Sequence, residues 1–261
     1  MIRGIRLRRS LFILAEFVVL IAIWQLVVSM FGIKQFLLPG PGAVAETLVE
    51  DWRGLLVHTR STLLEVVVGY AIAVVFGLVL AVTMVSNRAL ERAVYPIIVM
   101  LQAIPKVAIA PLLVVWLGFG KAPIIATTAV IAFFPVTVST IVGLKGIGQN
   151  MINLGRVMGL SWAQMFIKIR FPNSLPSVFG GLKVGMTLAV IGAVVGEFIG
   201  AENGLGALIL ISTSALNTPT TFSAILIIAV VGVVLFWVIE AIERFSIPWH
   251  ETQARDREKL L

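Results

Sequence analysis

The sequence contains six apolar runs, each about as long as a helix needs to cross the hydrocarbon of a bilayer, which is roughly 20 residues. An ordinary water-soluble globule is excluded, because 59% of the 261 residues are hydrophobic and only 13% are charged. We therefore expect an all-α, polytopic membrane protein with a single transmembrane domain over residues 1–261. The predicted spans are residues 11–33, 62–85, 93–117, 122–144, 177–201 and 221–239.

Lysine and arginine are distributed unevenly between the segments that join these runs. Short loops rich in these residues stay in the cytoplasm, so the richer side is predicted to be cytoplasmic, together with both termini. The run 11–33 is longer than the apolar core of a secretory signal, which favours an uncleaved first span. The richer side carries Arg3, Arg6, Arg8, Arg9, Arg88, Arg92, Lys145, Arg156, Lys168, Arg170, Arg244, Arg255, Arg257 and Lys259. The other side carries Lys34, Arg53, Arg60 and Lys121.

The longest internal connection, residues 145–176, is a cytoplasmic loop with an amphipathic helical pattern. We expect two short helices that meet at Gly159, with Ser161 as the N-cap of a helix that starts at Trp162. Phe171-Pro172 is expected to end that second helix. Apolar side chains carried into the cytoplasm suit a groove on another protein. The alternative is a helix that lies in the headgroup layer.

This loop resembles the signature of the binding-protein-dependent permeases of ATP-binding-cassette importers, E-A-A-x-x-x-G followed by I-x-L-P. The chain has Asn153-Leu154-Gly155, Gly159 and Ile169-Arg170-Phe171-Pro172 in the same register. Asn153 replaces the family's acidic residue, and Phe171 replaces its leucine. The resemblance implies that the loop couples the permease to its ATPase. The implied coupling residues are Asn153, Gly155, Gly159, Leu160, Ser161, Trp162, Ile169, Phe171 and Pro172.

Other stretches resemble the branch of this family that imports nitrate, taurine, aliphatic sulfonates, bicarbonate and some vitamin-precursor pyrimidines. The first stretch is residues 38–44, after the first predicted span. The second, in the third span, is residues 103–108 together with 111–112 and 116–120. The third, at the end of the fifth span, is residues 196–201 together with 204–206. The resemblance implies a type I importer permease in a bacterial inner membrane. It also implies two ATPase subunits, an external substrate-binding protein and a second permease subunit. The second permease is expected to be a second copy of this chain, and a paralogue is the alternative.

The chain itself offers little chemistry for catalysis. It lacks a G-x-x-x-x-G-K-[ST] phosphate loop, so ATP and Mg²⁺ are expected on the ATPase partner. Cysteine is absent, and His58 and His250 are too few and too far apart for a metal cage. We expect neither an enzyme nor a metal or cofactor site. An ion-coupled secondary transporter remains a more distant alternative, although the proline-rich span has no counterpart in a second half.

Lys106 is the main candidate for the translocation pathway, because a cation inside a span is costly and usually faces a cavity or a partner. Pro105 and Pro111 break the same span, as is tolerated where helices line a pathway. In the alternative interpretation, Lys106 snorkels to an interface or pairs with Glu65 or Glu197.

The charge pattern gives two further expectations. The stretch between Arg92 and Gly196 contains no acidic residue, which would favour a small anionic solute in a pathway lined by it. Glu197 is expected to act at a gate on the pathway, to hold a loop against the binding protein, or to be an interface carboxylate that is hydrogen-bonded within the helix bundle.

Overall fold

The computed structural model describes residues 2–248, and within this range the chain is helical and contains no strand. The predicted all-α membrane fold is therefore confirmed. The elements are α1 (Ile2–Met30), α2 (Pro41–Glu50), α3 (Trp52–Ser86), α4 (Arg88–Ala103), η1 (Lys106–Ile109), α5 (Ala110–Leu117), α6 (Lys121–Lys145), α7 (Gln149–Val157), α8 (Trp162–Met165), η2 (Phe166–Arg170), α9 (Phe171–Gly200), α10 (Leu205–Ser214) and α11 (Thr218–Ser246).

Among the described residues, four helices are long and apolar enough to cross a membrane: α3, α6, α11 and the continuous helix Trp162–Gly200. The bent pair of Arg88–Ala103 and Lys106–Leu117 gives a fifth span if it is counted as one. In α1, the segment Val18–Met30 is apolar and lies within the first predicted span. The total of six crossings stays a prediction.

The third predicted span, residues 93–117, is not one straight helix. Helix α4 ends at Ala103, and the following helical segment leaves it at 90°. Pro105 lies at the break and has no N–H to continue the ladder, and Ile104 is extended with φ −72° and ψ 129°. Pro111 then falls in the first turn of α5, where a missing donor costs little.

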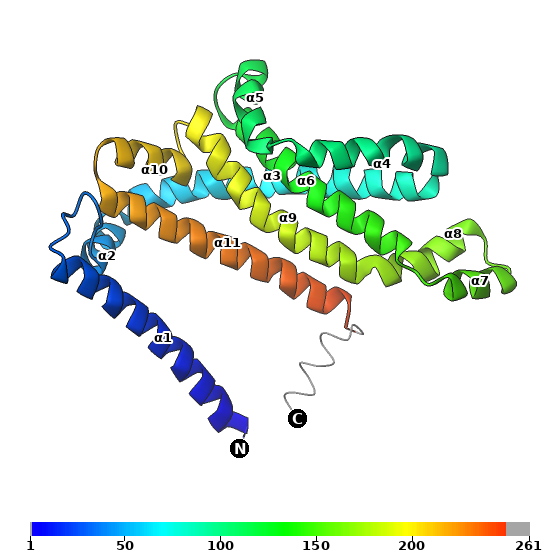
Figure 1. The fold of residues 1–261 in the computed structure, drawn as a ribbon, viewed down its shortest axis with the longest axis horizontal. Coiled ribbons are helices and arrows are strands. Elements are labelled where there is room, and N and C mark those ends of the chain that lie inside the picture. The colour runs from blue at the N-terminus through cyan, green and yellow to red at the C-terminus, as the bar shows by residue number, and fades with distance from the viewer. Residues whose placement is uncertain (1, 249–261) are drawn as a thin grey trace.

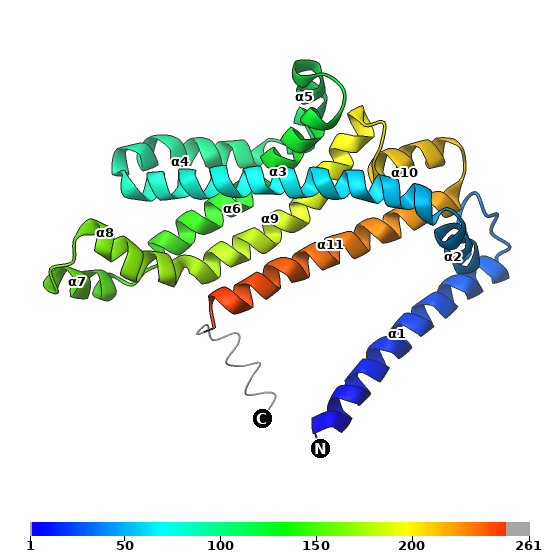
Figure 2. The ribbon, with the colours of Figure 1, turned by 180° about the vertical axis from the view of Figure 1, so that it is seen from behind.

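The helices form a bundle in which α6 lies between α3 and α9 (Figure 1). Helices α7 and α8 lie at one end of the bundle, whereas α2 and α10 lie at the other (Figures 1 and 2). The helices approach closely at glycines. A Cβ on Gly181 would lie 2.5 Å from Ser139 Cβ and 2.9 Å from the carbonyl of Pro135 on α6. Small residues of this kind are what membrane helices use to pack against each other.

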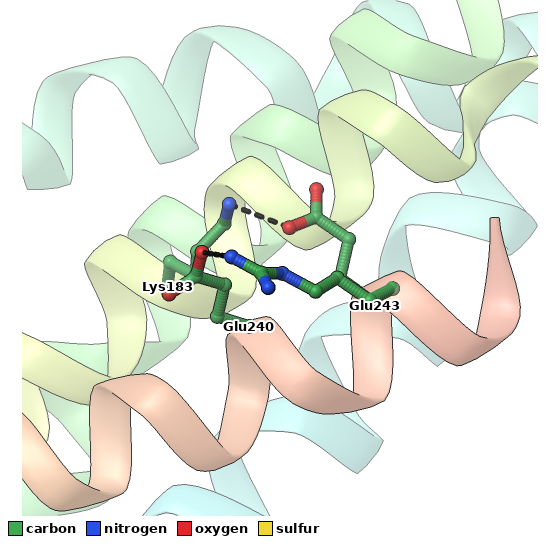
Figure 3. Close-up of polar contacts among 4 residues, drawn as sticks. Lys183, Glu240 and Glu243 are labelled. Carbon is green, nitrogen blue, oxygen red and sulfur yellow. Dashed lines mark hydrogen bonds and ion pairs between the residues drawn. The ribbon is translucent and has the colours of Figure 1, made fainter. Parts of the chain in front are cut away.

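An ion pair joins α9 to α11 (Figure 3). Lys183 Nζ lies 2.6 Å from Glu243 Oε2, and both side chains are largely shielded from solvent. Arg244, the residue after Glu243, pairs with Glu240 one turn earlier on α11 at 2.7 Å. The cation that the sequence places within the fifth span is therefore compensated by a carboxylate on the neighbouring helix.

The contact at Gly181 can be tested with a matched pair of variants. Gly181→Val should lower the thermal unfolding temperature of the detergent-solubilised protein, because the added atoms meet the backbone of α6; overpacking typically costs about 1–3 kcal/mol. Gly180→Val is the control, since a Cβ at Gly180 meets nothing within 4 Å. Equal unfolding temperatures for the two variants would contradict this account of the α6–α9 contact.

Candidate functional site

The predicted docking segment, residues 149–170 and called the docking segment below, consists of α7, a tight turn, α8 and η2. Helix α7 ends at Val157, and the chain turns as predicted at Gly159, which has a positive φ of 72°. The N–H of Gly159 donates to the carbonyl of Arg156, and the N–H of Leu160 donates to the carbonyl of Gly155, both at 3.0 Å. These bonds satisfy the last carbonyls of α7 and require a residue that tolerates left-handed backbone.

The start of the second helix also confirms the sequence prediction. Ser161 Oγ accepts from the N–H of Gln164 at 3.3 Å, and Gln164 Oε1 accepts from the N–H of Ser161 at 2.9 Å. This reciprocal capping box fixes the first turn at Trp162.

The predicted end of that helix at Phe171-Pro172 is wrong. Residues Phe166–Arg170 form a π-helical turn, in which the N–H of Phe171 donates to the carbonyl of Phe166, and the chain continues directly into α9. The wider turn accommodates Pro172, which lacks an N–H and would crowd the carbonyl four residues earlier in a regular helix. The docking segment and the fifth span are therefore one continuous helix of 39 residues, Trp162–Gly200.

The predicted coupling residues divide into an inward and an outward set. Gly155 is buried against Met165 and Ile169, where a Cβ would lie 2.5 Å from Met165 Cε, so it holds the two short helices together. Asn153 is exposed and accepts from Gln149 Nε2 at 3.2 Å. Trp162 is exposed and stacks on Phe166 with ring centroids 5.6 Å apart.

The outward face of the docking segment carries large apolar side chains among polar ones such as Gln149, Arg156 and Lys168. Its exposed large apolar side chains are Met151, Leu154, Val157, Met158, Trp162 and Ile167. Phe171 and Pro172 lie next to this face, at the first turn of α9.

Lys106 lies at the bend between α4 and α5, beside a cavity of about 440 Å³. Lys106 Nζ donates to the carbonyl of Gln102 at 3.2 Å and lies 4.8 Å above the ring centroid of Phe134. Within the described residues it forms no ion pair with Glu65 or Glu197, in contrast to the alternative that the sequence left open. The Lys106 cavity is lined by Gln102, Lys106, Val107, Ile131, Phe134, Pro135, Val138, Ser139, Leu188 and Ile191.

Glu197 is buried near the end of α9 and organises the start of α10. Its Oε2 accepts from the N–H of Gly206 at 2.5 Å, and its Oε1 accepts from Thr62 Oγ1 at 2.6 Å. Thr62 Oγ1 in turn accepts from the N–H of Leu205 at 2.8 Å. A carboxylate at a helix N-terminus is favoured both by the free N–H groups and by the helix dipole. This arrangement matches the bundle interpretation of Glu197.

Sequence reasoning missed two of the residues that surround Glu197. Thr62 lies 135 positions earlier in the chain, so no local pattern links it to Glu197. The sequence suggested Glu65 only as a possible partner of Lys106, whereas this residue, one helical turn after Thr62, is 0% exposed. Glu65 Oε1 accepts from Ser61 Oγ at 3.2 Å.

Glu65 and Glu197 both line a second cavity of about 460 Å³, which we call the Glu65 cavity. It lies where α3, the start of α6, the end of α9 and α10 meet. Its other charged side chains are Lys121 and Glu202, so acidic groups predominate. The anion-favouring character expected from the acid-free stretch 92–196 therefore does not extend to this cavity.

Comparison with known proteins agrees with this architecture. Residues 73–246 match the family described as "Binding-protein-dependent transport system inner membrane component", and the chain belongs to this family of permease subunits. The formylaminopyrimidine transport permease of Halalkalibacterium halodurans is 35% identical over 91% of this chain and 95% of that protein. The riboflavin transport permease of Chloroflexus aurantiacus is 35% identical over 88% of this chain and 87% of that protein. The taurine transport permease of Escherichia coli is 28% identical over 89% and 87%.

A solved structure has the same fold. A chain of the inward-facing methionine transporter MetNI superimposes with a TM-score of 0.66 at 20% identity, covering 75% of this chain and 97% of that chain. The expected type I importer permease fold is thus confirmed.

The contacts around Glu197 predict a specific role for Thr62. Thr62→Val should lower the unfolding temperature, because the N–H of Leu205 and a carboxylate oxygen of Glu197 lose a buried partner, at roughly 1–3 kcal/mol each. It should also accelerate thiol labelling of Asn203→Cys, a unique thiol in a chain without cysteine, by loosening the start of α10.

Thr59→Val is the matched control on the same helix, since among the described residues Thr59 Oγ1 donates to the carbonyl of Leu55 and to no other helix. Labelling and unfolding that are the same in both variants would contradict an anchoring role for Thr62.

Proposed function

We propose that this chain forms the translocation pathway of an ATP-binding-cassette importer for a small solute that an external binding protein delivers. The observation that carries this proposal is the continuous helix Trp162–Gly200. It joins an exposed apolar docking face at one end of the bundle to the buried Glu197 contacts at the other. A rigid element of this kind can convert movement of a docked partner into movement at the far end of the bundle.

ATPase subunits are the proposed partners of the docking segment. They would bind ATP and Mg²⁺ and hydrolyse the nucleotide, while this chain would perform no catalysis. Exposed Met, Leu, Val and Trp side chains on two short helices suit insertion into a hydrophobic groove. Association with an ATPase also separates this proposal from an ion-coupled secondary transporter, which needs none.

The membrane arrangement follows from the positive charges. We propose that the end of the bundle with α7 and α8 faces the cytoplasm of a bacterial inner membrane, with both termini on that side. The basic residues near this end lie in the loop 145–176 and at the neighbouring ends of α4, α6 and α11. They are Arg88, Arg92, Lys145, Arg156, Lys168, Arg170 and Arg244, against Lys34, Arg53, Arg60 and Lys121 on the other side. Arg255, Arg257, Lys259 and His250 lie outside the described residues. A second copy of the chain would complete the pathway.

Two solute classes are supported by different observations. The Lys106 cavity, with one cation and no acidic side chain, favours a small anion such as nitrate, bicarbonate or a sulfonate like taurine. The Glu65 cavity, where acidic groups predominate, favours a solute with hydrogen-bond donors, such as a vitamin-precursor pyrimidine. Relatives named for both classes match most of this chain.

The docking assignment is tested at Gly159. Gly159→Val should reduce the amount of ATPase subunit that co-purifies with the permease at least several-fold, because a β-branched residue is strained at a φ of 72° and the turn between α7 and α8 would change. Gly148→Val is the control in the same segment, since its φ is −55° and a Cβ there meets nothing within 4 Å. An unchanged complex with Gly159→Val would count against docking at this segment.

The pathway assignment is tested at Lys106. Lys106→Met should reduce ATP-driven solute uptake into proteoliposomes roughly tenfold or more while leaving the ATPase complex intact, because only the charge beside the cavity is removed. Lys34→Met, outside the predicted spans, should leave uptake unchanged. Normal uptake by Lys106→Met would remove Lys106 from the pathway.

A further inference from the structure

An open groove near α10, at the end of the bundle opposite the docking segment, carries two positive charges from different helices (Figure 1). It has a volume of about 320 Å³ and lies where α3, the start of α6 and the turn between α9 and α10 meet. We call it the Arg60 groove. Its lining residues are Val57, Arg60, Ser61, Leu64, Lys121 and Asn203.

The fold brings these two charges together from distant parts of the sequence. Positive residues are few on the side of the membrane away from the docking segment, as expected for a side that is not cytoplasmic. Two of them, Arg60 and Lys121, meet at the Arg60 groove, and both side chains are exposed. The groove therefore concentrates the positive charge of this side in one place.

The two charges are not compensated by carboxylates of the described chain. Neither Arg60 nor Lys121 takes part in an ion pair of residues 2–248. Glu65 lies behind Ser61 and is 0% exposed, and Ser61 Oγ donates to it. Glu202 lines the neighbouring Glu65 cavity, whereas the lining of the Arg60 groove contains no acidic residue. A pair of exposed cations without an anionic partner favours an anion from outside the chain.

The groups in the groove suit a phosphate. A guanidinium such as that of Arg60 donates two parallel hydrogen bonds to phosphate oxygens, and the ammonium of Lys121 adds a point charge. The amide of Asn203 supplies a further N–H donor from the turn between α9 and α10. A phosphate held by all three would link α3, α6 and this turn.

The apolar part of the groove indicates where the rest of the ligand lies. Val57 and Leu64 are exposed and line the groove together with the cations. Beyond Leu64, the exposed side chains Val68, Val75 and Val79 continue along α3 at four- and seven-residue spacings, so they share one face of the helix. An apolar face that runs from a cationic groove into a membrane span suits an acyl chain below its headgroup, whereas a free phosphate would use the groove alone.

We propose that the Arg60 groove binds the phosphate of an anionic phospholipid such as phosphatidylglycerol, with an acyl chain along the exposed face of α3. Arg60 and Lys121 would repel the ammonium group of a zwitterionic headgroup, so the groove selects for net negative charge. A lipid that binds the folded chain also stabilises it by mass action. The proposed membrane orientation places this lipid in the outer leaflet, and only that placement rests on the proposed function.

The site is tested by native mass spectrometry of the full-length chain in detergent, titrated with phosphatidylglycerol and with phosphatidylcholine of the same acyl chains. We expect phosphatidylglycerol to bind about fivefold more tightly or better and to raise the unfolding temperature. Inorganic phosphate in large excess should not displace it. Equal binding of the two lipids would overturn the proposal, and so would displacement by inorganic phosphate, which would show a site for free anions.

Matched charge variants locate the lipid. Arg60→Gln and Lys121→Gln should each weaken the binding of phosphatidylglycerol about fivefold, because each removes one cation from the groove. Arg53→Gln is the control, since it removes the same charge from α3 two turns earlier, where the guanidinium lies 5.3 Å above the ring centroid of Trp52 and outside the groove. An equal loss in Arg53→Gln, or full binding by both groove variants, would contradict this location.

The lipid site and the permease function can fail independently. The titration needs neither ATP nor an ATPase, so a lack of lipid selectivity together with normal ATPase co-purification removes the site and leaves the permease function. Lipid selectivity without ATPase association does the reverse. If a groove variant does not fold, as judged by its elution profile and unfolding temperature, the comparison of the two lipids on the unmodified chain still decides the outcome.

Discussion

The bilayer requires the chain to satisfy its own backbone hydrogen bonds wherever water is absent, and the irregular parts of this structure are the places where a regular helix fails to do so. At the start of α10 the N–H of Leu205 donates a hydrogen bond to Thr62 Oγ1, and the N–H of Gly206 donates one to Glu197 Oε2. At Pro172 a π-helical turn replaces a bond that the proline cannot make. At Pro105 the helix bends by 90° instead, and Lys106 follows directly after the break.

The π-helical turn and the bend at Pro105 connect their helices differently: the first keeps two helical segments in line, and the second turns one by 90° from the other. The π-helical turn keeps the docking segment in line with α9, whose far end holds Glu197. The ion pair between Lys183 and Glu243 ties α9 to α11. Movement of residues 162–170 would therefore be carried through α9 to α11, whereas α4 is separated from α5 by the 90° bend at Ile104 and Pro105.

Sequence patterns predicted the parts of the structure that depend on local chemistry. The runs 62–85, 122–144 and 221–239 fall inside α3, α6 and α11, because length and hydropathy alone decide which helices prefer lipid. The break at Gly159 and the cap at Ser161 follow from the backbone of glycine and the hydroxyl of serine. Proline was less informative. Pro172 and Pro105 both interrupt a helical sequence pattern. Pro172 nevertheless lies within a continuous helix, whereas Pro105 lies at a bend of 90°.

The contacts that depend on distant segments were beyond prediction from one sequence. Thr62, Glu65 and Glu197 come from two helices, and nothing in the local sequence of α3 indicates that its first acidic residue is completely buried beside the end of α9. The acid-free stretch was informative for the Lys106 cavity, where Lys106 is the only charged residue in the lining, but not for the Glu65 cavity, whose carboxylates lie outside that stretch.

The two cavities differ in the charge of their walls. Among the described residues that line the Lys106 cavity, Lys106 alone is charged, and its ammonium group already donates to the carbonyl of Gln102. In the Glu65 cavity three acidic side chains, Glu65, Glu197 and Glu202, accompany one basic side chain, Lys121. A cation beside one cavity and an excess of acidic groups beside the other create different local potentials, so the net charge of the whole chain describes neither cavity.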